Sequence, residues 1–165
     1  MVRPSWEEYA CIMALAARSR SEDPHTKVGA AILNIKGELV ATGYNGLMPN
    51  MEYPAHFLLE ENRVKKGELT IHAEYNAIKR CKDSPHLLAS TINPCAHCAK
   101  DIAAGGIRQV IFITRNTRCD WKFLEIFDFY GVEYKQMTVS SVQNILSHYD
   151  DSRRFLEQIL NNEQH

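Results

Sequence analysis

Apolar residues near the start of the chain recur every three or four positions, which is the period of a helix buried on one face. This stripe consists of Tyr9, Ile12, Met13, Leu15 and Ala16. Ser5 and Glu8 stand just before it in the spacing of a capping box, in which each residue's side chain bonds the other's backbone N–H. The pattern therefore predicts a first helix over residues 6–18.

The next apolar run, residues 28–35, is uninterrupted, as is typical of a strand buried on both faces. Lys36 and Gly37 then give a tight-turn signal, and residues 38–44 follow as a second strand. We expect an antiparallel hairpin here, because a tight turn can join only antiparallel neighbours.

Helix and strand patterns alternate after residue 70. The expected elements are a helix over 72–81, a strand over 87–91, a helix over 95–104, a strand over 109–114, a helix over 121–130 and a strand over 132–138. This alternation implies parallel pairing, whereas the opening hairpin is antiparallel. The sequence therefore predicts an α/β fold of three α/β/α layers, with a five-stranded mixed sheet and helices on both faces.

Residues 47–69 interrupt this order. They contain Pro49, Pro54 and Gly67 and show no clean strand pattern. We expect a long functional loop with a helix around 56–65.

The C-terminal region carries two amphipathic pieces, residues 142–146 and 153–160. We expect them to form extra helices that cover the core or pack against a neighbouring subunit. Because no linker or internal repeat occurs, a single domain is predicted over 1–165, with its core at about 5–138 and a helical tail at 139–165.

Composition narrows the functional classes. The chain has 165 residues, 45% of them hydrophobic, and a formal net charge of −1, which argues against disorder and against a surface that grips long nucleic acids. Neither an apolar signal segment nor a membrane-spanning run is recognisable. Cys11, Cys81 and Cys119 are expected to be buried or incidental thiols, so we expect a cytoplasmic protein with no membrane partner.

Two short stretches, His72-Ala73-Glu74 and residues 94–98 (PCAHC), supply the candidate chemistry. Cys95 and Cys98 are three positions apart, so both sulfurs can lie on one face at a helix N-terminus, where thiolates are favoured. With His72 as third ligand, a Zn²⁺ ion keeps one tetrahedral position for water. Glu74 is interpreted as the catalytic acid and base, provided that it shares a first helical turn with His72.

Other interpretations of these residues remain open. A lone C-x-x-C motif is more often a redox pair or part of a structural zinc site, and a lone H-x-E says little. Their combination, H-x-E followed by P-C-x-x-C, is the signature of zinc nucleobase deaminases. A structural zinc site would need a fourth protein ligand, such as His97, in place of water.

The chain resembles deoxycytidylate (dCMP) deaminases of the zinc-dependent cytidine and deoxycytidylate deaminase family over about residues 17–134. The resemblance rests on four motifs in the family's order: RSEDPHTKVGA (20–30), GYNG (43–46), HAEYNAI (72–78) and PCAHCAK (94–100). It implies a cytidine-deaminase-like fold and hydrolysis of dCMP to dUMP and ammonia, for thymidylate synthesis. It also implies a homohexamer that dCTP activates and dTTP inhibits, with Mg²⁺ at the regulatory nucleotide.

Individual roles follow from the same resemblance. Asn45 would bond the substrate sugar, the Ala73 backbone would read the base, and Arg20 would contact the phosphate. The regulatory nucleotide would be lined by residues of one loop, namely Gly43, Tyr44, Gly46 and Asn50.

The segment after the fourth strand departs from the family, because it lacks the tyrosine that commonly lies near the substrate. Arg115, Arg118 and Trp121 are the residues of this segment that could contact substrate. The unusual segment leaves open a dCTP deaminase or a bifunctional dCMP/dCTP deaminase. A deaminase acting on nucleic-acid polymers is a further alternative, against which the balanced charge argues.

Overall fold

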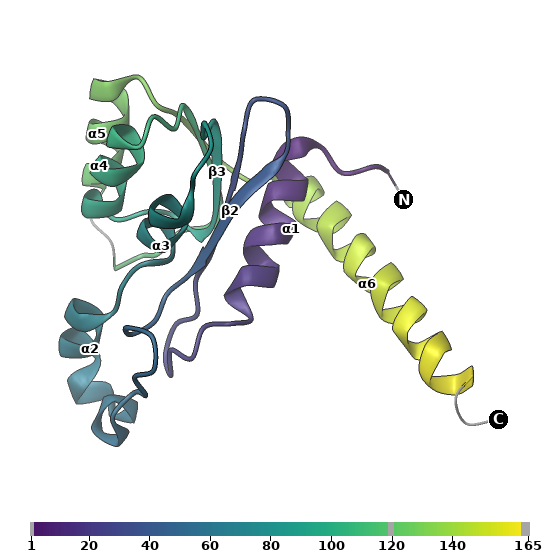
Figure 1. Ribbon diagram of the computed structural model, residues 1–165, viewed down its shortest axis with the longest axis horizontal. Coiled ribbons are helices and arrows are strands. Elements are labelled where there is room, and N and C mark those ends of the chain that lie inside the picture. The colour runs from purple at the N-terminus through teal and green to yellow at the C-terminus, as the bar shows by residue number, and fades with distance from the viewer. Residues whose placement is uncertain (1, 119–120, 163–165) are drawn as a thin grey trace.

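The computed structural model describes residues 2–118 and 121–162, so Cys119 lies outside the described part (Figure 1). The elements in chain order are α1 (Trp6–Arg18), β1 (Gly29–Leu33), β2 (Leu39–Tyr44), η1 (Ala55–Leu58), η2 (Glu60–Asn62), α2 (Arg63–Leu69), α3 (Ala73–Arg80), β3 (Leu87–Ile92), α4 (Ala96–Ala104), β4 (Gln109–Thr114), α5 (Lys122–Tyr130), β5 (Glu133–Gln136) and α6 (Val139–Asn162).

The strands form one five-stranded sheet in the order β2-β1-β3-β4-β5. β1 runs antiparallel to both β2 and β3, whereas β3, β4 and β5 are parallel. The mixed sheet and the opening hairpin predicted from the sequence are therefore confirmed. β5 is shorter than expected, because Val132 and Met137 at its two ends leave the strand and pack into the core.

Side chains alternate between the two faces of the sheet and divide the core into two layers. Ile32, Leu88 and Val110 belong to the cluster shared with α3, α4 and α5. Ala31 and Ala89 belong to the opposite cluster, which α1 and the start of α6 complete. Figure 1 shows α3, α4 and α5 on one side of the sheet and α1 on the other, so the three-layer α/β/α fold is confirmed.

The first helix begins and ends where the pattern predicts. The Ser5 side chain accepts a bond from the Glu8 N–H at 3.1 Å, and the Glu8 carboxylate accepts one from the Ser5 N–H at 2.9 Å. The capping box is thus formed, and it satisfies N–H groups that no helical carbonyl can reach.

The segment before α3 differs from the expectation. The helix expected around 56–65 is instead two 3₁₀ turns followed by α2, which runs to Leu69. Leu59 has an extended backbone (φ −78°, ψ 133°) that separates the two turns. α2 is held by Lys66, whose buried ammonium group pairs with Asp23, a partner that local periodicity does not reveal.

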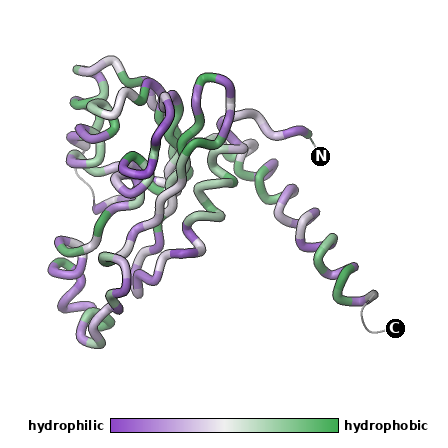
Figure 2. Tube along the Cα trace, viewed as in Figure 1, coloured by the Kyte–Doolittle hydropathy of each residue, from purple (hydrophilic) through white to green (hydrophobic). Residues whose placement is uncertain are grey.

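The two expected C-terminal pieces are one continuous helix of 24 residues, α6. The intervening residues 147–152 contain no glycine or proline that would end a helix. The first half of α6 is anchored to α1, since Asn144 donates to Glu8 at 2.9 Å and the Tyr149 hydroxyl donates to the Ile12 carbonyl at 3.3 Å. The second half extends away from the sheet with apolar residues along it (Figures 1 and 2).

Across residues 2–118 and 121–162, no helix is both long enough and apolar enough to cross a membrane.

Candidate active site and metal centre

Three side chains converge where α3 and α4 begin. His72 is the N-cap of α3, Cys95 is the N-cap of α4, and Cys98 lies in the first turn of α4. The Nδ1 atom of His72 is 3.5 Å from the Cys95 sulfur and 3.3 Å from the Cys98 sulfur. The three ligand atoms all lie within 4.8 Å of one another, so the structure brings the three predicted ligands together.

These distances fit a tetrahedral zinc site. With Zn–S bonds of about 2.3 Å and Zn–N bonds of about 2.05 Å, the nitrogen–sulfur edge of a tetrahedron measures about 3.6 Å. The two measured edges are 3.3 and 3.5 Å. Among the described residues, the metal-competent group comprises these three side chains and does not include the exposed His97. A Cys₂His donor set leaves the fourth position for a non-protein ligand, as catalytic zinc sites do.

The surroundings of Cys95 favour its thiolate, which is the form that binds metal. A hydrogen bond from Cys98, assisted by His72, lowers the pKa of Cys95 to about 3. The bond with Cys95, together with burial, raises the pKa of Cys98. The bond to Cys95 also raises the pKa of His72. Metal binding releases protons from such groups, because the ligand forms are the thiolate and the neutral imidazole.

Glu74 lies beside this group in the first turn of α3, as the sequence required. It is only 4% exposed, and its carboxylate accepts a bond from the Ser90 hydroxyl at 3.3 Å on one oxygen. The other oxygen is 3.6 Å from the Cys98 sulfur. Burial raises the pKa of Glu74 and outweighs the opposing charge of His72. A raised pKa makes a carboxyl group a better proton acceptor, as a general acid and base requires.

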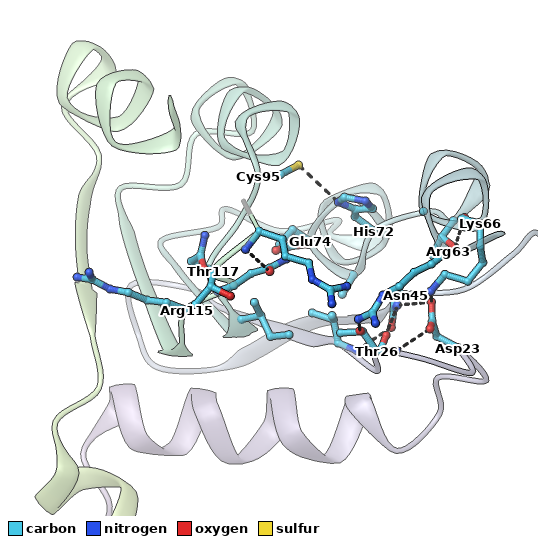
Figure 3. Close-up of a pocket in the computed structure, with 18 residues that line it drawn as sticks. Asp23, Thr26, Asn45, Arg63, Lys66, His72, Glu74, Cys95, Arg115 and Thr117 are labelled. Atoms are coloured by element: carbon cyan, nitrogen blue, oxygen red, sulfur yellow. Dashed lines mark hydrogen bonds and ion pairs between the residues drawn. The ribbon is translucent and has the colours of Figure 1, made fainter. Parts of the chain in front are cut away.

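Glu74 and two of the three ligand residues, His72 and Cys95, line a pocket of about 480 Å³, shown in Figure 3. The volume lies within the range of about 300 to 1,000 Å³ that is typical of small-molecule sites. The pocket is lined by Asp23, Thr26, Val28, Asn45, Arg63, Lys66, Gly67, Thr70, His72, Ala73, Glu74, Ile92, Asn93, Cys95, Arg115, Asn116, Thr117 and Arg118. Ala73 is the first residue of α3, so its N–H has no acceptor within the helix.

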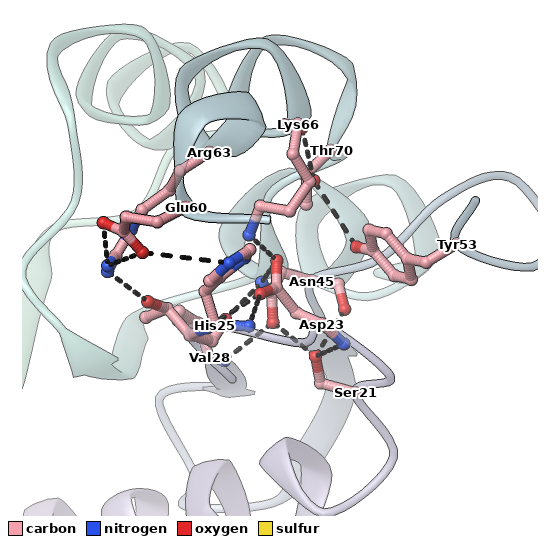
Figure 4. A network of polar contacts seen from close by, with 11 residues as sticks. Ser21, Asp23, His25, Val28, Asn45, Tyr53, Glu60, Arg63, Lys66 and Thr70 are labelled. Carbon is pink, nitrogen blue, oxygen red and sulfur yellow. Dashed lines mark hydrogen bonds and ion pairs between the residues drawn. The ribbon is translucent and has the colours of Figure 1, made fainter. Parts of the chain in front are cut away.

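Asn45 forms part of the pocket wall and also holds the neighbouring loop in place. Its side-chain oxygen accepts bonds from the Ser21 hydroxyl and the Val28 N–H, both at 2.7 Å. Its amide nitrogen donates to the Thr26 carbonyl at 2.8 Å and to Asp23 at 3.3 Å. These contacts fix the side chain in one orientation (Figure 4). The sugar contact expected of Asn45 stays a prediction.

A buried ion pair lies behind Asn45. The Lys66 ammonium on α2 contacts the Asp23 carboxylate, and both side chains are almost completely buried. Asp23 also accepts bonds from the His25 N–H at 2.8 Å and the Thr26 N–H at 2.7 Å. Burial alone would raise the pKa of Asp23, but the bonds from Lys66 and the backbone lower it overall. The pair joins α2 to the loop after α1, and so holds the wall of the pocket together (Figure 4).

The structure does not test the phosphate contact expected of Arg20. Arg20 is not among the pocket-lining residues, and its guanidinium lies 5.8 Å from the centre of the Tyr44 ring. Arg80 lies over the same ring at 5.5 Å. The substrate role of Arg20 stays a prediction.

The residues expected to line a regulatory site have varied surroundings. Gly43 packs against α3, where a Cβ atom would come within 2.2 Å of the Ala73 carbonyl oxygen. Gly46 forms an isolated bridge with Ile71, and the exposed Asn50 has a positive φ of 65°. The structure thus gives Gly43 a packing role that the sequence did not reveal, and the regulatory role of this loop stays a prediction.

The segment after β4 supplies the cationic side of the pocket. Arg115 and Arg118 line it, whereas Trp121 does not. The Arg115 guanidinium stacks on the Trp121 ring at 4.7 Å, and Figure 3 shows Arg115 on the far side of Glu74 from Arg63 and Lys66. Asn93 accepts a bond from the Asn116 N–H at 2.6 Å, which ties this segment to the end of β3.

Sequence reasoning missed the pocket residues Arg63, Lys66 and Asn93. Lys66 and Asp23 are 43 positions apart and meet only in the folded chain. Asp23 stands inside the RSEDPHTKVGA motif, which was the available signal, but no local pattern marks Arg63 or Lys66.

Comparison with known proteins gives consistent matches. The family model described as "Cytidine and deoxycytidylate deaminase zinc-binding region" matches residues 4–114. Deoxycytidylate deaminase of Homo sapiens is 37% identical over 117 residues, which cover 66% of this chain and 65% of the human protein. The probable deoxycytidylate deaminase of Drosophila melanogaster is 32% identical over 148 residues, which cover 79% of this chain and 71% of the fly protein. The match to the human protein thus spans just under two thirds of its length.

A solved structure shows the same fold. The dCMP deaminase of cyanophage S-TIM5, crystallised in complex with dCMP and dUMP, superposes with a TM-score of 0.60 at 23% identity. The superposition covers 83% of this chain and all of the cyanophage chain.

Proposed function

Because the chain belongs to the cytidine and deoxycytidylate deaminase family, we propose that it hydrolyses dCMP to dUMP and ammonia. One observation carries this proposal: the buried carboxyl of Glu74 lies beside the group formed by His72, Cys95 and Cys98, and Glu74, His72 and Cys95 line one pocket. Hydrolytic deamination needs an ionisable water and a group that moves protons, and the site can hold both.

The three ligand residues and Glu74 have separate roles in the reaction. When bound by His72, Cys95 and Cys98, Zn²⁺ supplies the Lewis acidity that makes a water molecule ionisable near pH 7. Glu74 takes a proton from the attacking water and passes it to the ring nitrogen beside C4 of cytosine. The water oxygen bonds to C4, and Glu74 then carries the remaining proton of that oxygen to the amino group. The C4–N bond breaks, ammonia leaves and a carbonyl remains at C4. The Ser90 hydroxyl holds the Glu74 carboxyl in place for both transfers.

The pocket wall supports a nucleotide as substrate. The Ala73 N–H at the start of α3 can bond the base, and Asn45 can bond the sugar from the opposite wall. Arg115 and Arg118 both line the pocket, and the permanent charge of a guanidinium suits a phosphate group. We infer that these two arginines contact the phosphate, because they line the pocket and Arg20 does not.

The choice of dCMP over other cytosine compounds rests on the relatives. The human and fly proteins are named as deoxycytidylate deaminases, and the cyanophage enzyme was crystallised with dCMP and dUMP. A net charge of −1 disfavours a nucleic-acid polymer as substrate. Turnover of dCMP, dCTP, deoxycytidine and a cytosine-containing oligonucleotide separates the alternatives, and faster turnover of dCTP than of dCMP would contradict the proposal.

The proposal includes regulation and assembly. We infer a cytoplasmic homohexamer that is activated by dCTP and inhibited by dTTP, with Mg²⁺ at the regulatory nucleotide. Four free cysteines among the described residues support a reducing compartment. Titrating each nucleotide into a dCMP assay, with and without Mg²⁺, tests the regulation, and sedimentation velocity tests the assembly.

The decisive test of the mechanism is Glu74→Gln. This variant keeps the shape of the side chain but cannot carry a proton, so turnover of dCMP should fall by about 10² to 10⁴. Zinc content, measured by atomic absorption, should stay at the wild-type level because Glu74 is not a ligand. Glu125→Gln, at an exposed position on α5, is the matched control and should be fully active. A fully active Glu74→Gln variant would refute the assignment.

A further inference from the structure

The distal half of α6 exposes apolar side chains that no other element of the described chain covers. Phe155, Leu156, Ile159 and Leu160 are each between 41% and 62% exposed. This half of the helix projects away from the sheet (Figure 1). Soluble monomers rarely expose a contiguous apolar surface of this kind, so it indicates a partner.

These side chains continue a stripe that begins on the packed half of the same helix. Val142, Ile145, Tyr149, Leu156 and Ile159 recur at intervals of three, four, seven and three residues, which keeps them on one side of a helix. Ile145 is buried against α1 and the sheet, whereas Leu156 and Ile159 are exposed. The stripe therefore has one covered half and one uncovered half.

The charges on the distal half disfavour a membrane or a nucleic acid as the partner. Asp150, Asp151 and Glu157 pair with Arg153 and Arg154 on the helix itself, and the sum is one net negative charge. Helices that lie on membrane surfaces are instead rich in lysine and arginine, and so are nucleic-acid-binding segments. The partner is therefore a protein with an apolar surface.

The chain carries a matching surface. A groove of about 400 Å³ lies between α1, β4 and the first half of α6, lined by Leu15, Ile113, Val142, Ile145, Leu146 and Tyr149. All six side chains are apolar or aromatic. The distal half of α6 cannot reach this groove in its own chain, because α6 is one straight element that forms a wall of the groove.

We propose that two copies of this chain exchange the distal halves of α6, so that Leu156, Ile159 and Leu160 of each copy occupy the groove of the other. A twofold axis near residues 150–151 would pair the two helices antiparallel, with Ile159 of one copy opposite Val142 of the other. The same two surfaces then meet twice, as a twofold interface requires. This inference specifies one contact within the oligomer of the proposed function.

The exposed area is sufficient for a stable contact. With about 200 Å² for each fully exposed side chain, Leu156, Ile159 and Leu160 present roughly 320 Å² to solvent, and Leu146 with Tyr149 adds roughly 200 Å². The exchange buries both the distal side chains of α6 and the groove side chains on each partner. A standard stable interface buries about 800 Å² per partner, of which somewhat more than half is apolar. A parallel pairing of the distal halves would leave both grooves open and bury less.

Two charge substitutions and one control test the exchange in the full-length, zinc-loaded protein. Leu156→Asp introduces a charge on the inserted distal half of α6, and Leu146→Asp introduces a charge in the receiving groove. Both positions are 58% exposed, so neither change should disturb the fold of one chain. Gln158→Asp adds the same charge on the polar side of α6. Circular dichroism and thermal melting verify folding, and sedimentation velocity over a concentration series measures association.

We expect Leu156→Asp and Leu146→Asp each to weaken self-association by about 100-fold, and Gln158→Asp to change it by less than about threefold. A mixture of Leu156→Asp and Leu146→Asp should associate more strongly than either variant alone. In a mixed pair, the unchanged helix of one copy still meets the unchanged groove of the other. Association of Leu156→Asp equal to wild type, or a mixture no better than its components, would overturn the exchange. dCMP turnover of the wild-type protein, measured separately, decides the proposed function and has no bearing on this interface.

Discussion

The buried pair of Lys66 and Asp23 gives a prediction whose size follows from the contacts. In Lys66→Met the apolar stem is kept and the charge is lost, which leaves the Asp23 carboxylate buried without its cation. Removing one partner of such a pair costs about 3 to 5 kcal/mol. Asp23 keeps bonds from the His25 and Thr26 N–H groups and from Asn45, so we expect the lower end, about 3 kcal/mol. For a chain of this size that corresponds to a melting temperature lower by about 6 to 12 °C.

The pH dependence adds a second signature. The pKa of Asp23 is lowered in the folded protein, so the pair contributes stability above the unfolded-state pKa of about 3.9. This contribution is lost as pH falls from there through the lower folded-state pKa. The unfolding free energy of wild-type protein should therefore fall over this acid range more steeply than that of Lys66→Met, because the variant carboxylate is less strongly favoured.

Urea denaturation of zinc-saturated protein, repeated at several pH values, measures both effects. Lys65→Met is the matched control, because Lys65 is exposed and should change stability by less than about 0.5 kcal/mol. Combining Lys66→Met with Asp23→Asn should restore most of the loss, since no buried charge then lacks a partner. A double variant as unstable as Lys66→Met would contradict the assignment of the loss to an unpaired charge on Asp23.

Three further outcomes follow from the site and the helix ends. Gly43→Ala should lower zinc content and dCMP turnover together, because its Cβ would lie 2.2 Å from the Ala73 carbonyl oxygen and displace α3. The control Gly46→Ala should leave both unchanged, because its Cβ would meet nothing within 4 Å. Removing zinc with a chelator should lower the melting temperature, and readdition should restore it, because the ion binds only the folded donor set; equal melting curves would contradict a bound metal. Ser5→Ala should cost about 1 kcal/mol in urea denaturation through loss of the α1 cap, and an unchanged midpoint would argue against that role.

The parts of the site that depend on local spacing could be predicted from the sequence. His72 and Glu74 are two positions apart, and Cys95 and Cys98 are three apart, so a helix start was enough to place each pair. The alternation of strands and helices likewise fixed the mixed sheet. The first inference uses distances within one element, which its geometry determines, and the second uses the order of elements along the chain.

The remaining features depend on contacts between distant segments. Lys66 and Arg63 reach the pocket because α2 folds back onto the loop after α1, a contact that no periodicity encodes. Amphipathic spacing predicts two short helices where α6 is one, because the polar residues between the two pieces hide its continuity; a helix in solvent tolerates polar residues. The close approach of β2 to α3 at Gly43 could not be distinguished from a turn.

Small side chains determine how closely the two ligand-bearing helices pack, and so determine the geometry of the metal site. Ala73 and Ala77 in α3 and Ala99 in α4 are completely buried, so the spacing of the helices is set by methyl groups. An enlarged residue at Ala77 or Ala99 would spread the nitrogen and the sulfurs apart while every strand remained paired. The rate of zinc release should therefore respond to side-chain volume in this part of the core. A library of variants screened for zinc retention should identify core positions as well as pocket positions.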